Sequence, residues 1–221
     1  MREYQESGDS DRSGCTSVTC MVTPTHIICA NAGDSRCVYG RNSISTIAMS
    51  DDHKPYNEGE KRRIENAGGS VQFKRVDGDL AVSRALGDFQ YKRKDQIPIE
   101  QKVSCVPEIR VELRTAEDDI LLLACDGLWD VMSNEDATAK IREIYESGED
   151  SAMLIAEEML DCALDKGSRD NISAVVVKFQ GAKIGPKSSG GVTGIREARL
   201  KQQQSQLQGS NPTDEVTSNG V

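Results

Sequence analysis

Residues 119–125, DILLLAC, form a nearly continuous apolar run that leads directly into Asp126 and Gly127. A run this short is typical of a strand buried on both faces, because buried helices usually need ten or more residues. Residues 172–179, ISAVVVKF, indicate a second strand of the same kind. Both segments are therefore expected inside a sheet.

Further strands are indicated on the N-terminal side of this run. Residues 16–31 predict two β-branched strands around a turn at Thr23 and Pro24. Residues 36–49 predict further short strands broken by Gly40 and Asn42, and a strand restarts over residues 71–73. The polar segment 91–107, with two prolines, is expected to be a loop.

Three helices are indicated by capping residues and apolar spacing. Residues 57–67 predict an exposed helix that ends at Gly68 and Gly69. A second helix is predicted over residues 134–146, with Asn134 as its N-cap candidate, and a third over residues 151–165, with Ser151 as its cap. Because strands follow one another directly, we expect antiparallel sheets with helices packed outside, an α+β class.

The chain divides by composition near residue 180. Residues 1–180 are expected to form one domain, whereas residues 181–221 are rich in Gly, Ser, Gln and Asn. Such a segment buries too little apolar surface to offset its ordering entropy. We therefore predict a disordered polar tail over 181–221, with at most a transient helix over 195–207.

The chain is acidic, with a net charge of −9, so neither nucleic acid nor an anionic membrane surface is an expected partner. A solvated acidic surface explains the charge as well as cation binding does. Seven cysteines without a C-x-x-C pair, and two histidines, argue against zinc. We interpret Cys20, Cys29, Cys125 and Cys162 as reduced core thiols of a cytoplasmic or nuclear protein.

Carboxylates remain as the candidate chemistry, because the sequence has no phosphate-binding P-loop, no G-x-S-x-G elbow and no cysteine with Arg at phosphatase spacing. Asp34, Asp126 and Asp170 each stand at the end of a predicted buried strand. Strand ends can gather such groups at one sheet edge, where a hard cation such as Mg²⁺ or Mn²⁺ would compensate them. For each aspartate taken alone, an ordinary turn residue is the favoured interpretation.

Eight motifs resemble those of metal-dependent protein serine/threonine phosphatases of the PPM, or type 2C, family. They stand in the family's order from about residue 13 to residue 178. They are SGCTSV (13–18), NAGDSR (31–36), DHKP (52–55), NAGGSV (66–71), RVDGDLAVSRALGDF (75–89), VPEI (106–109), LLLACDGLWDVMSNE (121–135) and GSRDNIS (167–173).

The resemblance implies a sandwich of two antiparallel sheets with helices on both outer faces. It implies two Mg²⁺ or Mn²⁺ ions that activate a water toward phosphoserine or phosphothreonine in protein substrates. Asp126 and Asp170 would be ligands of the first ion, and Asp34, Asp126 and Asp130 would hold a third, weaker one. No catalytic residue is expected beyond these metal ligands.

The same resemblance places Arg75, Arg84 and His53 near the flap and the substrate groove. A structural ion pair is the favoured role for each arginine, and a hydrogen-bonded loop position is favoured for His53. The protein is expected to be a monomer.

The family's D-G-H-G-G motif, which supplies the aspartate between the two catalytic ions, does not occur in these 221 residues. We therefore expect a domain incomplete at its N-terminus, with exposed sheet edges and apolar faces and little or no activity on its own. A non-catalytic, phosphatase-like binding protein is the alternative. A simple divalent-cation-binding domain is a third and weaker interpretation.

Overall fold

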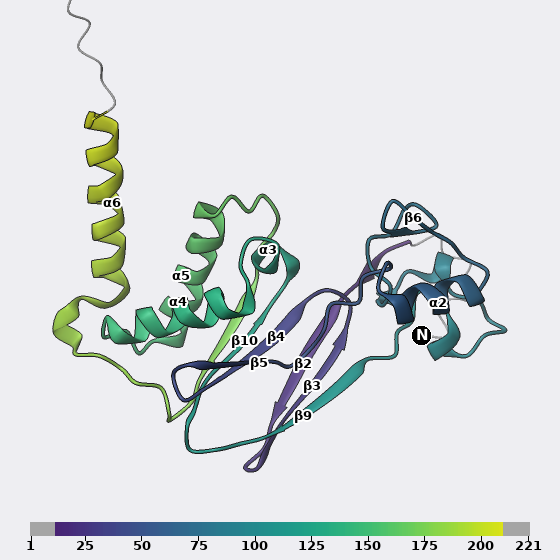
Figure 1. Ribbon diagram of the computed structural model, residues 1–221, viewed down its shortest axis with the longest axis horizontal. Helices are drawn as coiled ribbons and strands as arrows, with labels where there is room; N and C mark the ends of the chain where they lie inside the picture. The colour runs from purple at the N-terminus through teal and green to yellow at the C-terminus, as the bar shows by residue number, and fades with distance from the viewer. Residues whose placement is uncertain (1–11, 210–221) are drawn as a thin grey trace, which may run out of the picture.

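The computed structural model describes residues 12–209, and two antiparallel sheets form its centre (Figure 1). The larger sheet has the strand order β11-β10-β4-β5, which puts the 119–125 run on an inner strand as predicted. Its strands are β4 (Arg36–Arg41), β5 (Ser45–Ala48), β10 (Asp118–Ala124) and β11 (Ala174–Lys178). The second sheet has the order β2-β3-β9, from β2 (Ser17–Val22), β3 (His26–Ala32) and β9 (Glu108–Leu113).

Helices and two short strand pairs complete the fold. The short pairs are β1 (Gly14–Cys15) with β8 (Leu86–Gly87), and β6 (Val71–Gln72) with β7 (Arg75–Val76). The α-helices are α2 (Glu58–Asn66), α3 (Asp126–Trp129), α4 (Asn134–Glu146), α5 (Ala152–Asp165) and α6 (Gly191–Gly209). Short 3₁₀ turns lie at η1 (Phe89–Tyr91), η2 (Pro98–Glu100) and η3 (Lys187–Ser189). None of the helices in residues 12–209 has the length and apolar character needed to cross a bilayer.

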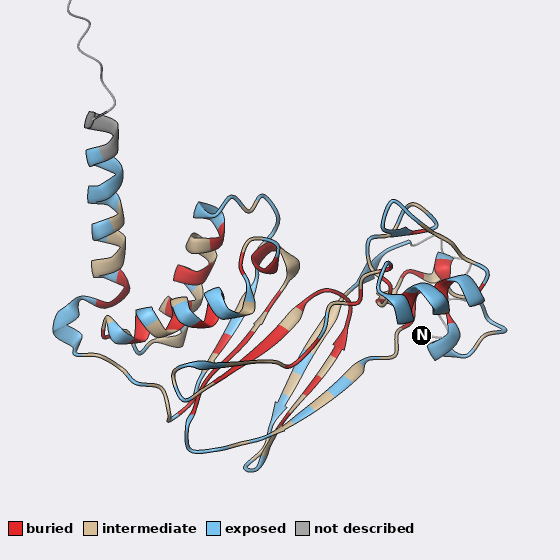
Figure 2. Ribbon diagram, viewed as in Figure 1, coloured by how far each residue is buried: buried red, intermediate tan, exposed pale blue. Residues whose placement is uncertain are grey.

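The described residues form three hydrophobic cores, of which the smallest includes Ile64 of α2 and Val103, and the other two lie on the two faces of the four-stranded sheet (Figure 2). One lies between the four-stranded sheet and helices α4 and α5, and includes Leu122, Ile141 and Ile155. The other lies between the two sheets and includes Tyr39 and Leu121. The alternation of Leu121 and Leu122 between the cores explains why this strand is apolar on both faces.

The outer face of the three-stranded sheet is exposed. Ile109 and Val111 are each 54% exposed and Leu113 63%, and no helix in residues 12–209 packs over them. The expectation of an uncovered apolar face is therefore confirmed for this sheet. The family-based expectation of helices on both outer faces is met only on the four-stranded sheet. Strand β9 was not predicted, although the strict polar and apolar alternation of EIRVEL is the usual signal of a half-buried strand.

Two local predictions are corrected by side-chain contacts. Strand β4 continues through Gly40 instead of breaking there. A Cβ at this position would lie 2.3 Å from Asp119 Oδ1, so the glycine leaves room for that buried carboxylate. The strand ends at Arg41, and the predicted break at Asn42, whose φ is 60°, is confirmed. Helix α4 is capped by Ser133, whose Oγ accepts from the Asp136 N–H at 3.0 Å, while Asn134 accepts from Arg36. The Ser151 cap of α5 is confirmed.

The predicted disorder of 181–221 is wrong for residues 191–209, which form α6; residues 210–221 lie outside the described residues. Val192 is buried and Ile195 packs against the core of α4 and α5. Arg196 and Arg199 reach Glu158 of α5, which is 0% exposed. The segment was predicted to be disordered from its overall polar composition. That composition does not report these four residues, which lie at helical spacing on one face of α6.

Glu158→Gln is expected to loosen α6 from the domain, because it leaves two arginines facing a neutral, buried amide. We expect a loss of a few kcal/mol in the free energy of unfolding and faster trypsin cleavage after Arg196, Arg199 and Lys201. Glu157→Gln is the matched control, since Glu157 is half exposed and lies 3.8 Å from Arg196. Equal cleavage rates in both variants would contradict this role for Glu158.

Candidate metal centre

Strand register brings the predicted aspartates to one end of the four-stranded sheet. Ala124 of β10 lies opposite Ala174 of β11 on one side and opposite Arg36 of β4 on the other. Asp126 follows β10, Asp170 precedes β11 and Asp34 precedes β4. Because the strands are antiparallel, these three positions share the same edge.

Close packing holds the Asp170 loop against α3. The Ser168 hydroxyl donates to the Gly127 carbonyl at 2.6 Å, and the Cys125 thiol donates to the Asn171 carbonyl at 3.2 Å. A Cβ on Gly127 would lie 2.4 Å from the Asn171 carbonyl oxygen, so only glycine permits this approach. Trp129 Nε1 donates to the Ala124 carbonyl at 2.9 Å and ties the short helix back to its strand.

Electrostatic coupling shows that the four aspartates are neighbours. Burial raises the pKa of Asp126, and the negative charges of Asp34, Asp170 and Asp130 raise it further, against the opposing charge of Lys54. Asp130 lies four residues after Asp126, which places both on one face of the α3 turn. Asp34, Asp130 and Asp170 are therefore near enough to Asp126 to affect its pKa, while the role of all four as metal ligands stays a prediction.

Lys54 is the residue of this edge that sequence reasoning missed. Its Nζ lies 2.6 Å from Asp34 Oδ2. Burial lowers the pKa of Lys54, but the hydrogen bond to Asp34 and the charges of Asp34, Asp52 and Asp130 outweigh it and raise the pKa. The signal was available, since Lys54 stands in the quoted motif DHKP directly after His53. Lys54 neutralises one carboxylate of the set.

The donor set fits a hard divalent cation in chemistry. It consists of carboxylate oxygens, and no His or Cys side chain belongs to it. Within residues 12–209, the one group of three His, Cys, Asp or Glu side chains whose ligand atoms all lie within 4.8 Å is a cysteine group elsewhere. The four aspartates are therefore close enough to repel one another without forming a closed three-ligand set.

Two clefts open beside the aspartates. One, of about 460 Å³, lies between the sheets and is lined by Thr16, Ser35, Cys125 and Ser173 among others. The other, of about 480 Å³, is lined by Asp130, Ser168 and Asp170 among others. The edge that carries the carboxylates is thus open on both sides of α3.

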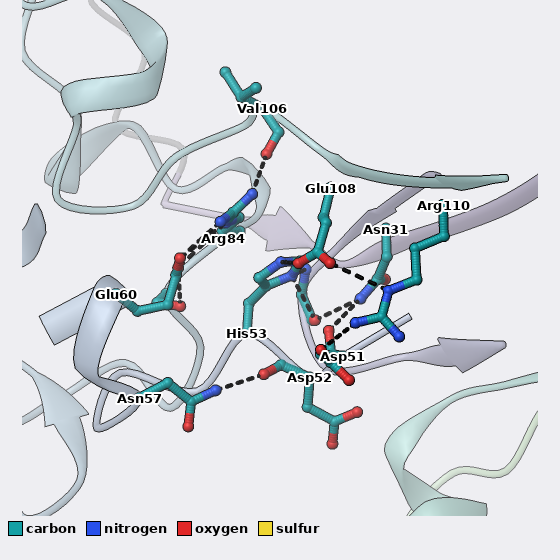
Figure 3. A network of polar contacts seen from close by, with 12 residues as sticks. Asn31, Asp51, Asp52, His53, Asn57, Glu60, Arg84, Val106, Glu108 and Arg110 are labelled. Carbon is teal, nitrogen blue, oxygen red and sulfur yellow. Dashed lines mark hydrogen bonds and ion pairs between the residues drawn. The ribbon is translucent and has the colours of Figure 1, made fainter. Parts of the chain in front are cut away.

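Arg84 and His53 lie together in a second polar network (Figure 3). Arg84 pairs with Glu60 at 2.7 Å and donates to the Val106 carbonyl at 3.1 Å, which confirms the structural ion pair. His53 is buried, with Nδ1 against Gly33 and Nε2 3.5 Å from Glu108. Burial and the charge of Arg84 lower the pKa of His53, so it is neutral at pH 7. This matches the predicted loop role.

Arg75 lies apart from that network. Its Nη1 donates to the Asp79 carbonyl at 2.6 Å, so its partner is backbone rather than the acid of an ion pair. The residue is exposed on the short strand β7. A substrate role for Arg75 remains a prediction.

Comparison with known proteins decides the family. The Protein phosphatase 2C family matches residues 1–172. The chain belongs to the protein phosphatase 2C family. It is 50% identical over 184 residues to protein phosphatase 1B from Homo sapiens, a match that covers 82% of this chain. A serine-threonine phosphatase 2C from Toxoplasma gondii has the same fold, with a TM-score of 0.67, 29% identity and 80% of this chain covered.

The chain spans only part of these 2C-family relatives. The match covers 38% of the human protein and 62% of the Toxoplasma gondii chain. A second Toxoplasma gondii phosphatase, 36% identical with a TM-score of 0.66, matches 72% of this chain and half of its own. The family is metal-dependent in general, and the family fold agrees with the two antiparallel sheets described above.

Proposed function

We propose that these residues supply part of the active site of a protein serine/threonine phosphatase that hydrolyses phosphoserine and phosphothreonine with Mg²⁺ or Mn²⁺. The observation that supports it is the gathering of Asp34, Asp126, Asp130 and Asp170 at one sheet edge beside open clefts. Bound ions would supply a water of lowered pKa and would neutralise phosphoryl charge.

Different aspartates of this chain are proposed as ligands of different ions. Asp126 and Asp170 would hold the first ion, and Asp34, Asp126 and Asp130 the third. The α3 turn and the loop at 168–171 fix Asp126 and Asp170 relative to each other through the contacts of Gly127. Lys54 holds Asp34 in place and lowers the local repulsion, so the third ion would have to compete with an ammonium group.

The substrates would be phosphoproteins, and the protein would act as a monomer in the cytoplasm or nucleus. The net charge of −9 supports the absence of nucleic acid and anionic membranes among its partners. The binding-protein alternative is less favoured, because the retained aspartates still converge and the named relatives are phosphatases.

A polypeptide of residues 1–221 alone is expected to show no measurable turnover of a phosphothreonine peptide with Mn²⁺. It holds the proposed ligands of the first ion but lacks the D-G-H-G-G aspartate expected between the ions. Joining it to the part of human protein phosphatase 1B that precedes the matched region is expected to give Mn²⁺-dependent, EDTA-sensitive hydrolysis. Phosphate release measures both.

The chimera needs its own reference. The same human segment without residues 1–221 should be inactive, which would show that this chain contributes the missing ligands. Robust turnover by residues 1–221 alone would contradict the proposed division of ligands. A folded but inactive chimera would count against the phosphatase assignment and favour a binding role.

A further inference from the structure

Three cysteines meet between the two sheets, and none of them belongs to the aspartate set. Cys20 lies on β2, Cys29 on β3 and Cys37 on β4 of the facing sheet. Their Sγ atoms all lie within 4.8 Å of one another, and Cys20 and Cys37 are 3.3 Å apart. Cys29 and Cys37 are 0% exposed. No other trio of His, Cys, Asp or Glu in residues 12–209 is this close.

The strands fix this cluster from both sides. Cys20 and Cys29 are directly opposite in the β2–β3 register, so their side chains point to the same face of the sheet. Cys37 points at them from the other sheet, within the core that contains Ile27, Tyr39 and Leu121. The thiols hydrogen-bond to one another in this apolar setting.

We propose that Cys20, Cys29 and Cys37 form a binding site for a soft, singly charged metal ion, Cu(I). Thiolate sulfur is the ligand that such soft ions select. Three sulfurs about 2.3 Å from a central ion in one plane stand about 4 Å apart. The cysteine trio therefore needs only small side-chain adjustments to close on an ion.

Coordination number separates Cu(I) from zinc. Structural zinc takes four ligands, and no fourth His, Cys, Asp or Glu completes this trio among residues 12–209. A soft monovalent ion is satisfied by two or three thiolates.

Binding requires two of the sulfurs to be thiolates, while the third can stay a neutral thiol. Each of the two thiols that ionise loses one proton to solvent, no electron is transferred, and the two thiolates with Cu(I) leave a single negative charge. The hydrogen bond to Cys29 raises the pKa of Cys20 to about 12, so an ion bound there has to displace that proton. Hydrogen bonds from Cys20 and Cys37 lower the pKa of Cys29 to about 4, and the positive charge of Arg110 contributes. Arg110 lies opposite Cys29 in the β3–β9 register, so a thiolate there has a cation nearby.

A disulfide between the sheets is the less suitable use of these thiols. Facing sheets pack about 10 Å apart, whereas a disulfide needs Cα atoms within about 7 Å. A sulfur–metal–sulfur bridge reaches further than a sulfur–sulfur bond. Bound metal would join the two sheets and stabilise the folded state in proportion to its occupancy.

The test loads the full chain with one equivalent of Cu(I) without oxygen, in competition with a chromophoric Cu(I) chelator. We expect one ion per chain, a near-ultraviolet thiolate–copper band and a rise in Tm of several degrees. Cys29→Ala and Cys37→Ala should each weaken binding by more than about tenfold. Cys15→Ala and Cys162→Ala are the controls and should bind as the unchanged chain does.

Three outcomes would overturn the site. The first is a Cu(I) affinity in Cys29→Ala that equals that of the unchanged chain. The second is a loss of Cu(I) affinity in the Cys162→Ala control as large as that in Cys29→Ala. The third is tighter binding of Zn²⁺ than of Cu(I) by the unchanged chain. If the core variants fail to fold, alkylation of the unchanged chain decides. Because Cys29 and Cys37 are buried even without metal, the labelling is done in mild urea and compared between the loaded and the metal-free chain. Cu(I) should slow the labelling of Cys20, Cys29 and Cys37 but not that of Cys15, as mass spectrometry of the peptides would show; equal labelling of the trio with and without Cu(I) would exclude the proposal.

Discussion

Asp126→Asn is expected to abolish hydrolysis in the active chimera, with a loss of kcat of more than about 100-fold. Replacing a residue that only hydrogen-bonds to a metal ligand typically lowers metal affinity or activity by about 10–100-fold. Asp126 is proposed as a direct ligand of two ions, so a larger loss of activity is expected. Asparagine keeps the size of the side chain but removes the charge that a hard cation requires. The measurement is phosphate release across a Mn²⁺ titration.

The same variant has a stability signature that a purely structural residue would not show. In the presence of EDTA, Asp126→Asn should unfold at an equal or higher temperature than the unchanged chimera. The reason is that Asp126 faces the charges of Asp34, Asp130 and Asp170 in a partly buried position, and the amide relieves that repulsion.

Glu135→Gln is the matched control for Asp126→Asn. Glu135 is an exposed carboxylate in the first turn of α4, outside the aspartate edge, and its loss should leave kcat within about twofold of the unchanged protein. If Asp126→Asn retained activity at saturating Mn²⁺, the residue would not be a ligand. Lower stability of Asp126→Asn in EDTA would mean that the carboxylate is held by favourable contacts rather than by a cation.

The order of elements and the aspartate edge were accessible from sequence because both depend on local patterns. Leu121 and Leu122 face different cores, so a continuous apolar run was a direct signal of an inner strand. Asp126 follows one of the two most apolar strands and Asp170 precedes the other. These strands pair antiparallel, which brings both residues to the same end of the sheet. The family resemblance supplied the roles of these residues, which spacing alone left open.

Features that depend on tertiary contacts were not accessible. Gly40 looks like a strand breaker until the Asp119 carboxylate is placed against it. The α6 segment has the composition of a disordered tail, and only the facing Glu158 explains why Arg196 and Arg199 order it. Lys54 and the cysteine trio likewise unite residues from different strands or loops, which no single-segment pattern reports.

Glu60→Gln is expected to lower the stability of the α2 region in a pH-dependent way. Glu60 is buried in α2 and accepts from Ser83 Oγ at 2.5 Å, from Arg84 Nη2 at 2.7 Å, and pairs with Arg63 Nη1 at 2.7 Å. Those partners tie α2 to residues 83 and 84, and Arg84 in turn donates to the Val106 carbonyl (Figure 3). Removing the carboxylate leaves two guanidinium groups without their anion.

The size and pH dependence of this loss follow from the pKa of Glu60. Burial raises that pKa, but hydrogen bonds from Arg84 and Ser83 and the charge of Arg63 outweigh it and lower the pKa from 4.5 to about 2. The shift corresponds to at most about 3 kcal/mol, and to about 2 kcal/mol after screening by nearby solvent. Because the folded pKa is the lower one, this contribution is full above pH 4.5 and disappears as the pH falls toward 2.

Urea unfolding of the unchanged chain and Glu60→Gln between pH 7 and pH 3 measures the effect. The two free energies of unfolding should differ by about 2 kcal/mol at pH 7 and converge as the pH falls below 4.5. Glu58→Gln is the matched control, since its carboxylate is exposed on the same helix and 3.7 Å from Arg62, and it should change stability by less than about 0.5 kcal/mol. A difference that stays constant with pH would show that Glu60 stabilises α2 by packing rather than by its charge.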